Sequence, residues 1–212
     1  MKSIIIENQL LPPISIYIIF VQSKNIIIEK HDNYNKRTYR NRFIINSSTG
    51  PQMISIPLKK GKNQLLYKDV KISYDNDWVK NIKKTLKTCY GSAPFFDFIY
   101  EDIIQIFEKR YKYLFDMNTE FRNYINDFLE IDTIFDYTQE YKKAYDSKII
   151  DLRDSFLPAH DLKSIVDGKN MSFRSIFEEK ENLIKNPSIL DLLFNMGKYS
   201  FEVLENLPFK VE

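Results

Sequence analysis

The sequence predicts an α/β fold in which strands dominate the first half of the chain. Short apolar runs rich in β-branched residues recur up to residue 74, whereas apolar residues recur at helical spacing from Asp77 onward. A further strand-like run follows the third predicted helix, and helix-to-strand alternation is typical of α/β proteins. We therefore expect a mixed sheet, a strand-rich N-terminal half, helices between Asp77 and Glu130, and a C-terminal helical segment.

The first half contains five predicted strands and one predicted helix. A helix over residues 14–22 follows Pro12 and Pro13, because proline is tolerated in the first turn of a helix. A strand on each side of this helix gives the chain a strand-helix-strand opening. The predicted strands cover residues 3–6, 25–29, 43–46, 53–58 and 70–74.

The second half alternates three predicted helices with a returning strand. The first helix runs from residue 77 to Gly91, a residue that commonly ends helices. Ser92 is the predicted N-cap of the second helix, with Pro94 in its first turn. The third helix is expected at residues 118–130 and the strand at residues 131–137.

A long polar segment and a short helix complete a chain that we expect to be one domain over residues 1–212. Residues 138–172 show little periodicity, and loops of this length are usually functional or mobile. The later SILDLLFN stretch places Ser188 three residues before Asp191, which predicts a capping box at a helix start.

Composition excludes several classes of protein. The chain has 31 basic and 29 acidic residues, a balance too even for a protein that coats nucleic acid or a membrane surface. The single cysteine, Cys89, excludes an internal disulfide and a zinc finger and favours a reducing cytoplasm. The apolar run at residues 14–21 is too short to span a bilayer. No metal site, cofactor or oligomeric state is indicated, and the nucleotide-binding, serine-hydrolase and zinc-protease motifs are absent.

The stretch EKHDNYNKRTYRNR, residues 29–42, is the strongest candidate for chemistry. His31 supplies an imidazole beside the carboxylate of Asp32, which predicts a catalytic pair. Adjacent residues of a strand point to opposite faces, however, so a surface histidine in a turn is the alternative.

The cations of the same stretch predict an anion site. In an extended chain Lys36, Arg40 and Arg42 share one face, and arginine suits phosphates and carboxylates. The alternative is a solvated strand with ion pairs to acidic residues. Tyrosines interleave with the cations, but the near-neutral charge of the chain makes a nucleic-acid partner the weaker reading.

The order of four stretches resembles the WbqC-like family of bacterial proteins over nearly the whole chain. They are LLPPIS, EKHDNYNKRTYRNR, YGSAPFFDFIYED and PSILDLLFNMG. The resemblance implies a protein of surface-polysaccharide (O-antigen type) biosynthesis that transfers a glycyl or acyl group to an amino-sugar nucleotide. A non-catalytic protein of the envelope assembly machinery that binds an anion or a partner is the alternative.

The resemblance also implies where ligands bind. A phosphorylated or nucleotide-linked small molecule is the implied partner, with His31 and Asp32 as catalytic residues. Pro94, Phe95 and Phe96 are expected in the core or a pocket wall, Asp191 at a helix cap, and Asn195 at that helix's end. The implied ligand-binding residues are Tyr34, Lys36, Arg37, Arg40, Asn41 and Arg42, with Asp151 and Arg153 as additions from the polar segment.

Overall fold

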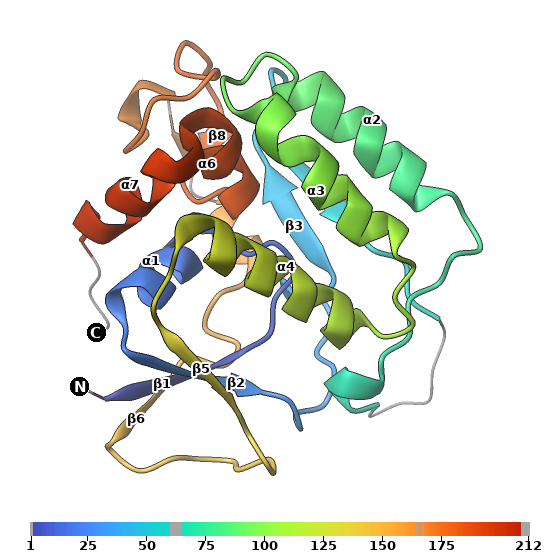
Figure 1. Ribbon diagram of the computed structural model, residues 1–212, viewed down its shortest axis with the longest axis vertical. Coiled ribbons are helices and arrows are strands. Elements are labelled where there is room, and N and C mark those ends of the chain that lie inside the picture. Colours follow the sequence, from blue (N-terminus) through green and yellow to red (C-terminus); the bar gives the residue numbers. More distant parts are fainter. Residues whose placement is uncertain (1, 60–64, 164, 167, 209–212) are drawn as a thin grey trace.

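A parallel sheet of four strands forms one end of the molecule in the computed structural model, which describes residues 2–59, 65–163, 165–166 and 168–208. The strand order is β5-β2-β1-β6. Figure 1 shows this sheet at the bottom, with α1 and α4 above it and the remaining helices further up. The strands are β1 (Ser3–Glu7), β2 (Asn25–Glu29), β3 (Arg42–Ile45), β4 (Gln52–Ser55), β5 (Ile134–Tyr137), β6 (Ile149–Asp151), β7 (Ile165–Val166) and β8 (Leu183–Ile184). The helices are α1 (Ile14–Gln22), α2 (Trp78–Tyr90), α3 (Phe96–Glu108), α4 (Leu114–Leu129), α5 (Pro158–Asp161), α6 (Ile189–Met196) and α7 (Ser200–Asn206), with 3-10 turns η1 (Tyr67–Asp69), η2 (Gly168–Asn170) and η3 (Gly197–Tyr199).

The predicted α/β class is confirmed, and the parallel and antiparallel pairs belong to separate sheets. β3 and β4 form an antiparallel pair, as do β7 and β8. The chain opens with β1, α1 and β2 as expected, and α1 has the predicted bounds. The isoleucine runs of β1 and β2 are largely buried, as is usual for central parallel strands covered on both faces.

Three predicted strands differ clearly in the structure. The strand predicted at residues 131–137 begins three residues later, at Ile134 of β5. β4 ends at Ser55, three residues before the predicted end of that strand. The strand predicted at residues 70–74 is wrong, since only isolated bridges form there: Ile72 pairs with Leu58, and Lys71 pairs with Tyr113. This apolar, β-branched run is thus extended, but it lacks the consecutive backbone pairs with one neighbouring segment that would make it a strand.

Two predicted helix starts are also wrong. α3 begins at Phe96, and Ser92 lies in a turn whose shape is set by a hydrogen bond from the Phe95 amide to the Phe194 carbonyl (3.0 Å). α4 begins at Leu114, which places Asn118 inside the helix. Asparagine is unfavourable there in an isolated helix. In the folded chain the Asn118 side-chain nitrogen donates hydrogen bonds to the Arg40 carbonyl (2.8 Å) and the Tyr67 hydroxyl (2.6 Å), which satisfies both of its N–H groups.

The segment at residues 138–172, expected to be a long polar loop, contains β6, α5, β7 and η2. β6 has three residues and forms an edge of the parallel sheet, where Ser3 of β1 stands opposite Ile149. Three residues carry too little periodicity to predict a strand, and its position depends on pairing with β1.

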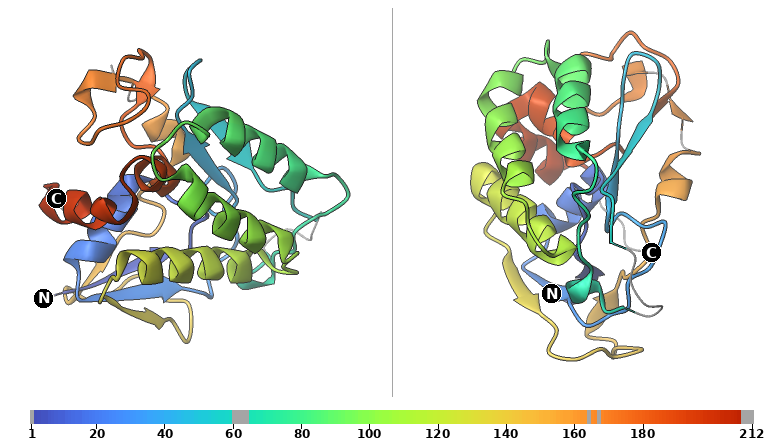
Figure 2. Two further views of the ribbon diagram at one scale, coloured as in Figure 1. Left: turned by 45° about the horizontal axis from the view of Figure 1, so that its top comes forward. Right: turned by 90° about the vertical axis from the view of Figure 1, so that its right-hand side faces the viewer.

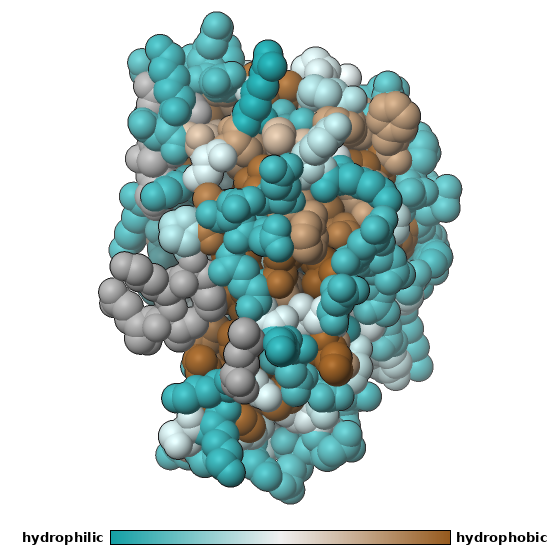
Figure 3. Space-filling model, turned by 60° about the vertical axis from the view of Figure 1, so that its left-hand side comes forward, coloured by the Kyte–Doolittle hydropathy of each residue, from teal (hydrophilic) through white to brown (hydrophobic). Residues whose placement is uncertain are grey.

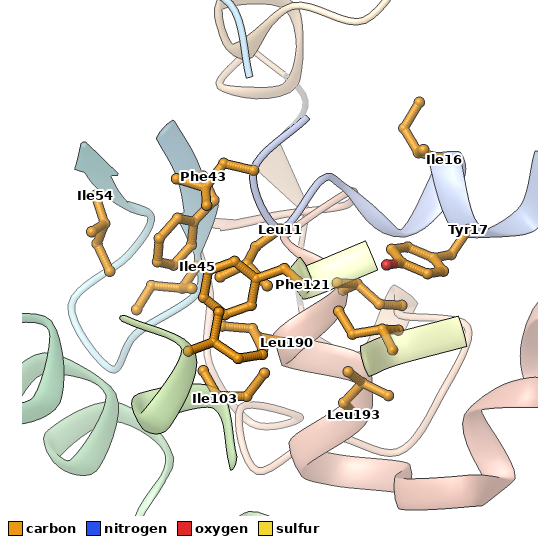
Figure 4. Packing of buried hydrophobic residues seen from close by; sticks show 14 of the residues in the cluster. Leu11, Ile16, Tyr17, Phe43, Ile45, Ile54, Ile103, Phe121, Leu190 and Leu193 are labelled. Atoms are coloured by element: carbon orange, nitrogen blue, oxygen red, sulfur yellow. The ribbon is translucent and has the colours of Figure 1, made fainter. Parts of the chain in front are cut away.

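One hydrophobic cluster joins the parallel sheet, the β3-β4 pair and most of the helices. In Figure 4, Leu11, Phe43, Ile45 and Phe121 lie close together, with Leu190 of α6 beside them. The face in Figure 3 is largely hydrophilic, with hydrophobic groups between the polar side chains, as on most folded surfaces. Within the described ranges, no helix has both the length and the apolar character needed to cross a bilayer.

The start of α6 shows how two of the quoted stretches meet. The Ser188 hydroxyl accepts a hydrogen bond from the Leu190 amide (3.3 Å), as a cap should. Asp191 does not complete the predicted capping box, because its buried carboxyl accepts a hydrogen bond from the Tyr90 hydroxyl (2.6 Å). Burial raises the pKa of Asp191 to about 6, although the Tyr90 hydroxyl and the Asn46 backbone amide oppose this rise.

We expect Asp191→Asn to remove a pH-dependent loss of stability. The folded-state pKa of Asp191 lies above its usual value of 3.8, so its ionisation destabilises the folded chain as pH rises from about 4 to about 6. The free energy of unfolding of the wild type, relative to Asp191→Asn, should fall by on the order of 3 kcal/mol over this range. Urea unfolding at a series of pH values measures it. Exposed Asp127→Asn is the control, and parallel pH curves for wild type and Asp191→Asn would contradict the assignment.

Candidate functional site

The ends of three parallel strands place polar residues at one edge of the sheet. β1 ends at Glu7, β2 ends at Glu29 and β6 ends at Asp151, and Glu7 stands opposite Glu29 in the register. In open α/β sheets, ligands bind outside the carboxyl ends of the strands. We call this group of side chains the strand-end site. It comprises Glu7, Glu29, His31, Asp32, Arg40, Asp151, Arg153 and Asp154, with Lys68 of η1 beside His31.

Arg40 is the buried cation of the strand-end site. Its guanidinium bonds the Asp32 carboxylate through Nη2 (3.0 Å) and the Asp154 carboxylate through Nη1 (2.7 Å). Burial lowers the pKa of Arg40, but Glu7 and Asp154 outweigh this effect, so the pKa is raised. Two carboxylates on one planar fork are a strong, charge-assisted arrangement. Arg40 therefore joins the segment after β2 to the segment after β6.

Glu7 stabilises the ion pairs of Arg40. Its buried carboxylate accepts hydrogen bonds from the Gln9 side chain (2.7 Å) and from the Asp154 backbone amide (3.0 Å). Burial raises the pKa of Glu7, and the positive charge of Arg40 opposes this rise. Glu7 thus fixes the backbone at the residue that pairs with Arg40.

Glu29 and Arg153 form a second buried pair. One Glu29 oxygen accepts hydrogen bonds from the Thr138 hydroxyl and the His31 backbone amide (both 2.8 Å). Its other oxygen lies 3.1 Å from Nη1 of Arg153. The Arg153 guanidinium also bonds both oxygens of Asp151, at 2.9 and 2.6 Å.

Arg153 further holds the β5–β6 connection over the site. It donates to the Lys142 carbonyl (2.9 Å), and its guanidinium lies 5.1 Å from the ring centroids of both Tyr141 and Tyr145. Such cation–π contacts are favourable. The polar segment predicted to add ligand contacts therefore covers Glu29.

His31 and Asp32 are the nearer candidates for chemistry. Nδ1 of His31 lies 3.5 Å from the Lys68 ammonium, and the tautomer that accepts from this ammonium has its ring proton on Nε2. Burial raises the pKa of Asp32, Arg40 lowers it, and the like charges of Asp154 and Glu29 raise it further. In the described part of the chain the His31 and Asp32 side chains do not bond to each other. The predicted direct pair is absent, although both residues belong to the same site.

Five other predicted ligand residues lie outside this network. Tyr34 donates to the Asn41 side chain (2.9 Å), and Asn41 donates to the Ile56 carbonyl (2.9 Å), which braces the segment before β3. The remaining three are Lys36, Arg37 and Arg42: the first two are exposed, and Arg42 is half-buried at the start of β3.

The expectation that Lys36, Arg40 and Arg42 share one face is wrong. The segment forms turns, and Arg37 adopts φ of +63°, so alternation along an extended strand does not apply. A role for Arg40 as a phosphate ligand stays a prediction, but its two carboxylate partners weaken it.

The sequence interpretation missed Glu7, Glu29, Lys68 and Asp154. Glu7 and Glu29 had a visible signal, because both parallel strands end with the same tetrad, Ile-Ile-Ile-Glu. Parallel strands bring such equivalent ends together. Lys68 and Asp154 had no comparable signal, since each reaches the site through tertiary packing.

The charged side chains of the site differ in how far they are exposed to solvent. The Arg40 and Arg153 side chains are 0% and 8% exposed, whereas those of Asp32, Asp151 and Asp154 are 17%, 34% and 38% exposed. The carboxylate side chains are therefore more exposed to solvent than the guanidinium groups that they contact. This surface can attract an ammonium group, and Asp32 can accept a proton. Among the described residues, no group of three or more His, Cys, Asp and Glu side chains is placed to hold a metal ion.

We expect Arg40→Met to destabilise the fold strongly. Removing the cation leaves the carboxylates of Asp32, Asp154 and Glu7 close together without their shared partner, which typically costs about 3 kcal/mol or more. The exposed Arg37→Met is the matched control and should change the free energy of unfolding by less than about 0.5 kcal/mol. Urea unfolding of both variants measures the difference. Equal stability of the two would show that Arg40 does not hold these segments together.

Comparison with known proteins covers three of the four quoted stretches. The model of the WbqC-like protein family matches residues 8–185, which include α1 to α5 and the whole strand-end site except Glu7, whereas the stretch PSILDLLFNMG lies beyond the matched residues. No curated protein and no solved structure matches the chain. A match over most of the chain shows its family. The chain belongs to the WbqC-like protein family.

Proposed function

We propose that the strand-end site binds the amine of a nucleotide-linked or phosphorylated amino sugar and transfers an acyl or aminoacyl group to it. The observation that supports this is that the partly exposed carboxylates of Asp32, Asp151 and Asp154 are bound to the buried guanidinium groups of Arg40 and Arg153. Such a surface attracts a protonated amine and repels a phosphate. The proposal places the protein in surface-polysaccharide biosynthesis and, because of its single free cysteine, in a reducing cytoplasm.

The proposed step is an attack of the amine on an activated acyl group. The bound ammonium first loses one proton and becomes a neutral amine. Its nitrogen then forms a bond to the carbonyl carbon, the bond between that carbon and its leaving group breaks, and the nitrogen releases its second proton to solvent. Asp32 accepts the first proton, because burial and neighbouring carboxylates raise the pKa of Asp32 and make it a better base. The leaving group departs with the electron pair and is protonated by solvent.

His31 receives a different role from the one its sequence position suggested. Its Nε2–H donates to the carbonyl oxygen as negative charge develops there, since Nδ1 faces the Lys68 ammonium. Arg40 and Arg153 position the carboxylates and do not contact the substrate. The geometry thus supports Asp32 as the base and His31 as the hydrogen-bond donor.

We expect Asp32→Asn to lower kcat by roughly 10²- to 10⁴-fold, because asparagine still accepts from Arg40 but cannot take a proton. His31→Ala should lower kcat by about 10²-fold or more through loss of the donor. Single-turnover mass spectrometry of amino-sugar nucleotides incubated with activated acyl donors measures both effects.

Asp132→Asn is the matched control, since this exposed carboxylate precedes β5 at the opposite end of the sheet. Full activity of Asp32→Asn would exclude Asp32 as the base. Thermal stabilisation by an amino-sugar nucleotide, with no product from any donor, would instead support the non-catalytic binding protein.

A further inference from the structure

Three extended segments outside the named strands lie side by side and bring cations together. The Lys59 amide donates to the Lys71 carbonyl (2.9 Å), and the Ile72 amide donates to the Lys112 carbonyl (3.1 Å). Leu58 pairs with Ile72 and Lys71 pairs with Tyr113 in antiparallel bridges. The segments lie on the side of the molecule that faces the viewer in the right panel of Figure 2. Residues distant in sequence thus form one surface.

A cleft of about 440 Å³ opens on this surface. Its volume falls in the range of small-molecule sites. Four exposed cations line it, together with Ile72, Tyr74 and Asp75. The cations are Lys59, Lys71, Arg110 and Lys112. We call this region the basic cleft.

The positive charge of the basic cleft is not paired with carboxylates of the described residues. Within the described ranges, none of its four cations forms an ion pair. The bridge between Leu58 and Ile72 sets Lys59 opposite Lys71, and like charges in directly opposite positions repel. The one acid of the lining, Asp75, accepts a hydrogen bond from the Ser73 hydroxyl (2.6 Å). The cleft therefore carries a local excess of positive charge, in a chain of net charge +2, that a bound anion would neutralise.

The one aromatic residue of the cleft lining, Tyr74, already contacts two other side chains. The Arg110 guanidinium lies 4.7 Å from the Tyr74 ring centroid, and the Trp78 ring lies 5.4 Å from it at an angle of 31°. Recognition of bases by proteins commonly uses stacking on exposed aromatic rings. The lining therefore offers chiefly charge and amine donors, which suit phosphate oxygens, and adds no second aromatic ring for stacking.

We propose that the basic cleft binds the diphosphate group of a small molecule and recognises that group without reading the base attached to it. The identity of the whole ligand rests on the proposed function, in which the acceptor is a nucleotide-linked amino sugar. Of the phosphate ligands expected from the sequence, Arg40 is paired with two carboxylates, whereas the cations of the cleft have no such partner among the described residues.

The two sites are connected through η1. Lys68 lies beside His31 in the strand-end site, and Lys71 of the basic cleft follows three residues later. The Cα atoms of Lys68 and Lys71 are therefore at most about 11 Å apart. A substrate with an amine at one end and a diphosphate at the other therefore matches the opposite charges of the two sites.

Isothermal titration of the full chain with inorganic pyrophosphate, and separately with a nucleoside diphosphate, tests the cleft directly. We expect both to bind with affinities within about tenfold of each other. Replacing Lys71 and Lys112 together by alanine should weaken both roughly tenfold or more, because two charge-assisted contacts are lost. The double variant Lys84→Ala with Lys87→Ala is the control, since it removes two exposed lysines of α2 that do not line the cleft. Circular dichroism confirms that each variant is folded.

Any of three results with small phosphate ligands would overturn the proposal. They are no binding of pyrophosphate at millimolar concentration, equal weakening in the two double variants, and a nucleoside diphosphate that binds more than about tenfold more tightly than pyrophosphate. Much tighter binding of an oligonucleotide than of pyrophosphate would also overturn it, in favour of a nucleic-acid surface. Failure of the proposed function is separate: pyrophosphate binding that depends on Lys71 and Lys112, with no acyl transfer, leaves the cleft assigned and excludes only the reaction.

Discussion

The ion pairs of Arg40 with Asp32 and Asp154 are the interaction on which the strand-end site depends. Asp32 follows β2 and Asp154 follows β6, so one guanidinium holds the exits of two strands that are separated by β1. Arg40 itself is held from another side, because Asn118 of α4 donates to its carbonyl. A buried cation is costly unless it is paired, and three nearby carboxylates supply that pairing. The same contacts position the carboxylates that face solvent.

The two sites differ in whether their cations form ion pairs with carboxylates. In the strand-end site each arginine is bound by carboxylates, which leaves acidic oxygens at the surface. In the basic cleft the cations lack such partners within the described residues, and an anion would gain most there. Counting charged residues in the sequence cannot separate these cases, because Arg40 and Lys71 look alike until their partners are seen. Burial and pairing, more than the number of cations, decide which surface attracts phosphate.

The blocks that carry the family resemblance divide into two physical roles. The stretch at residues 29–42 supplies Glu29, His31, Asp32 and Arg40 of the strand-end site and the turn that reaches β3. The other two long blocks pack against each other through the bond from Tyr90 to Asp191. They also meet at Gly197, where φ is +55° and a side chain would collide with the Phe95 ring. These latter contacts hold together helices that are about a hundred residues apart in the sequence.

The sequence by itself determined the α/β class, the strand-helix-strand opening, the bounds of α1 and the stretch that contains the candidate chemistry. These features follow from local periodicity and proline placement, which act over a few residues. It also contained an unread signal, the matching glutamates that end β1 and β2. Only the tertiary structure decided that Arg40 is buried, that Lys68 meets His31, and that Lys59, Lys71 and Lys112 line one cleft. These depend on contacts between segments far apart in the chain, where pairing and burial override local pattern, so no short window of sequence encodes them.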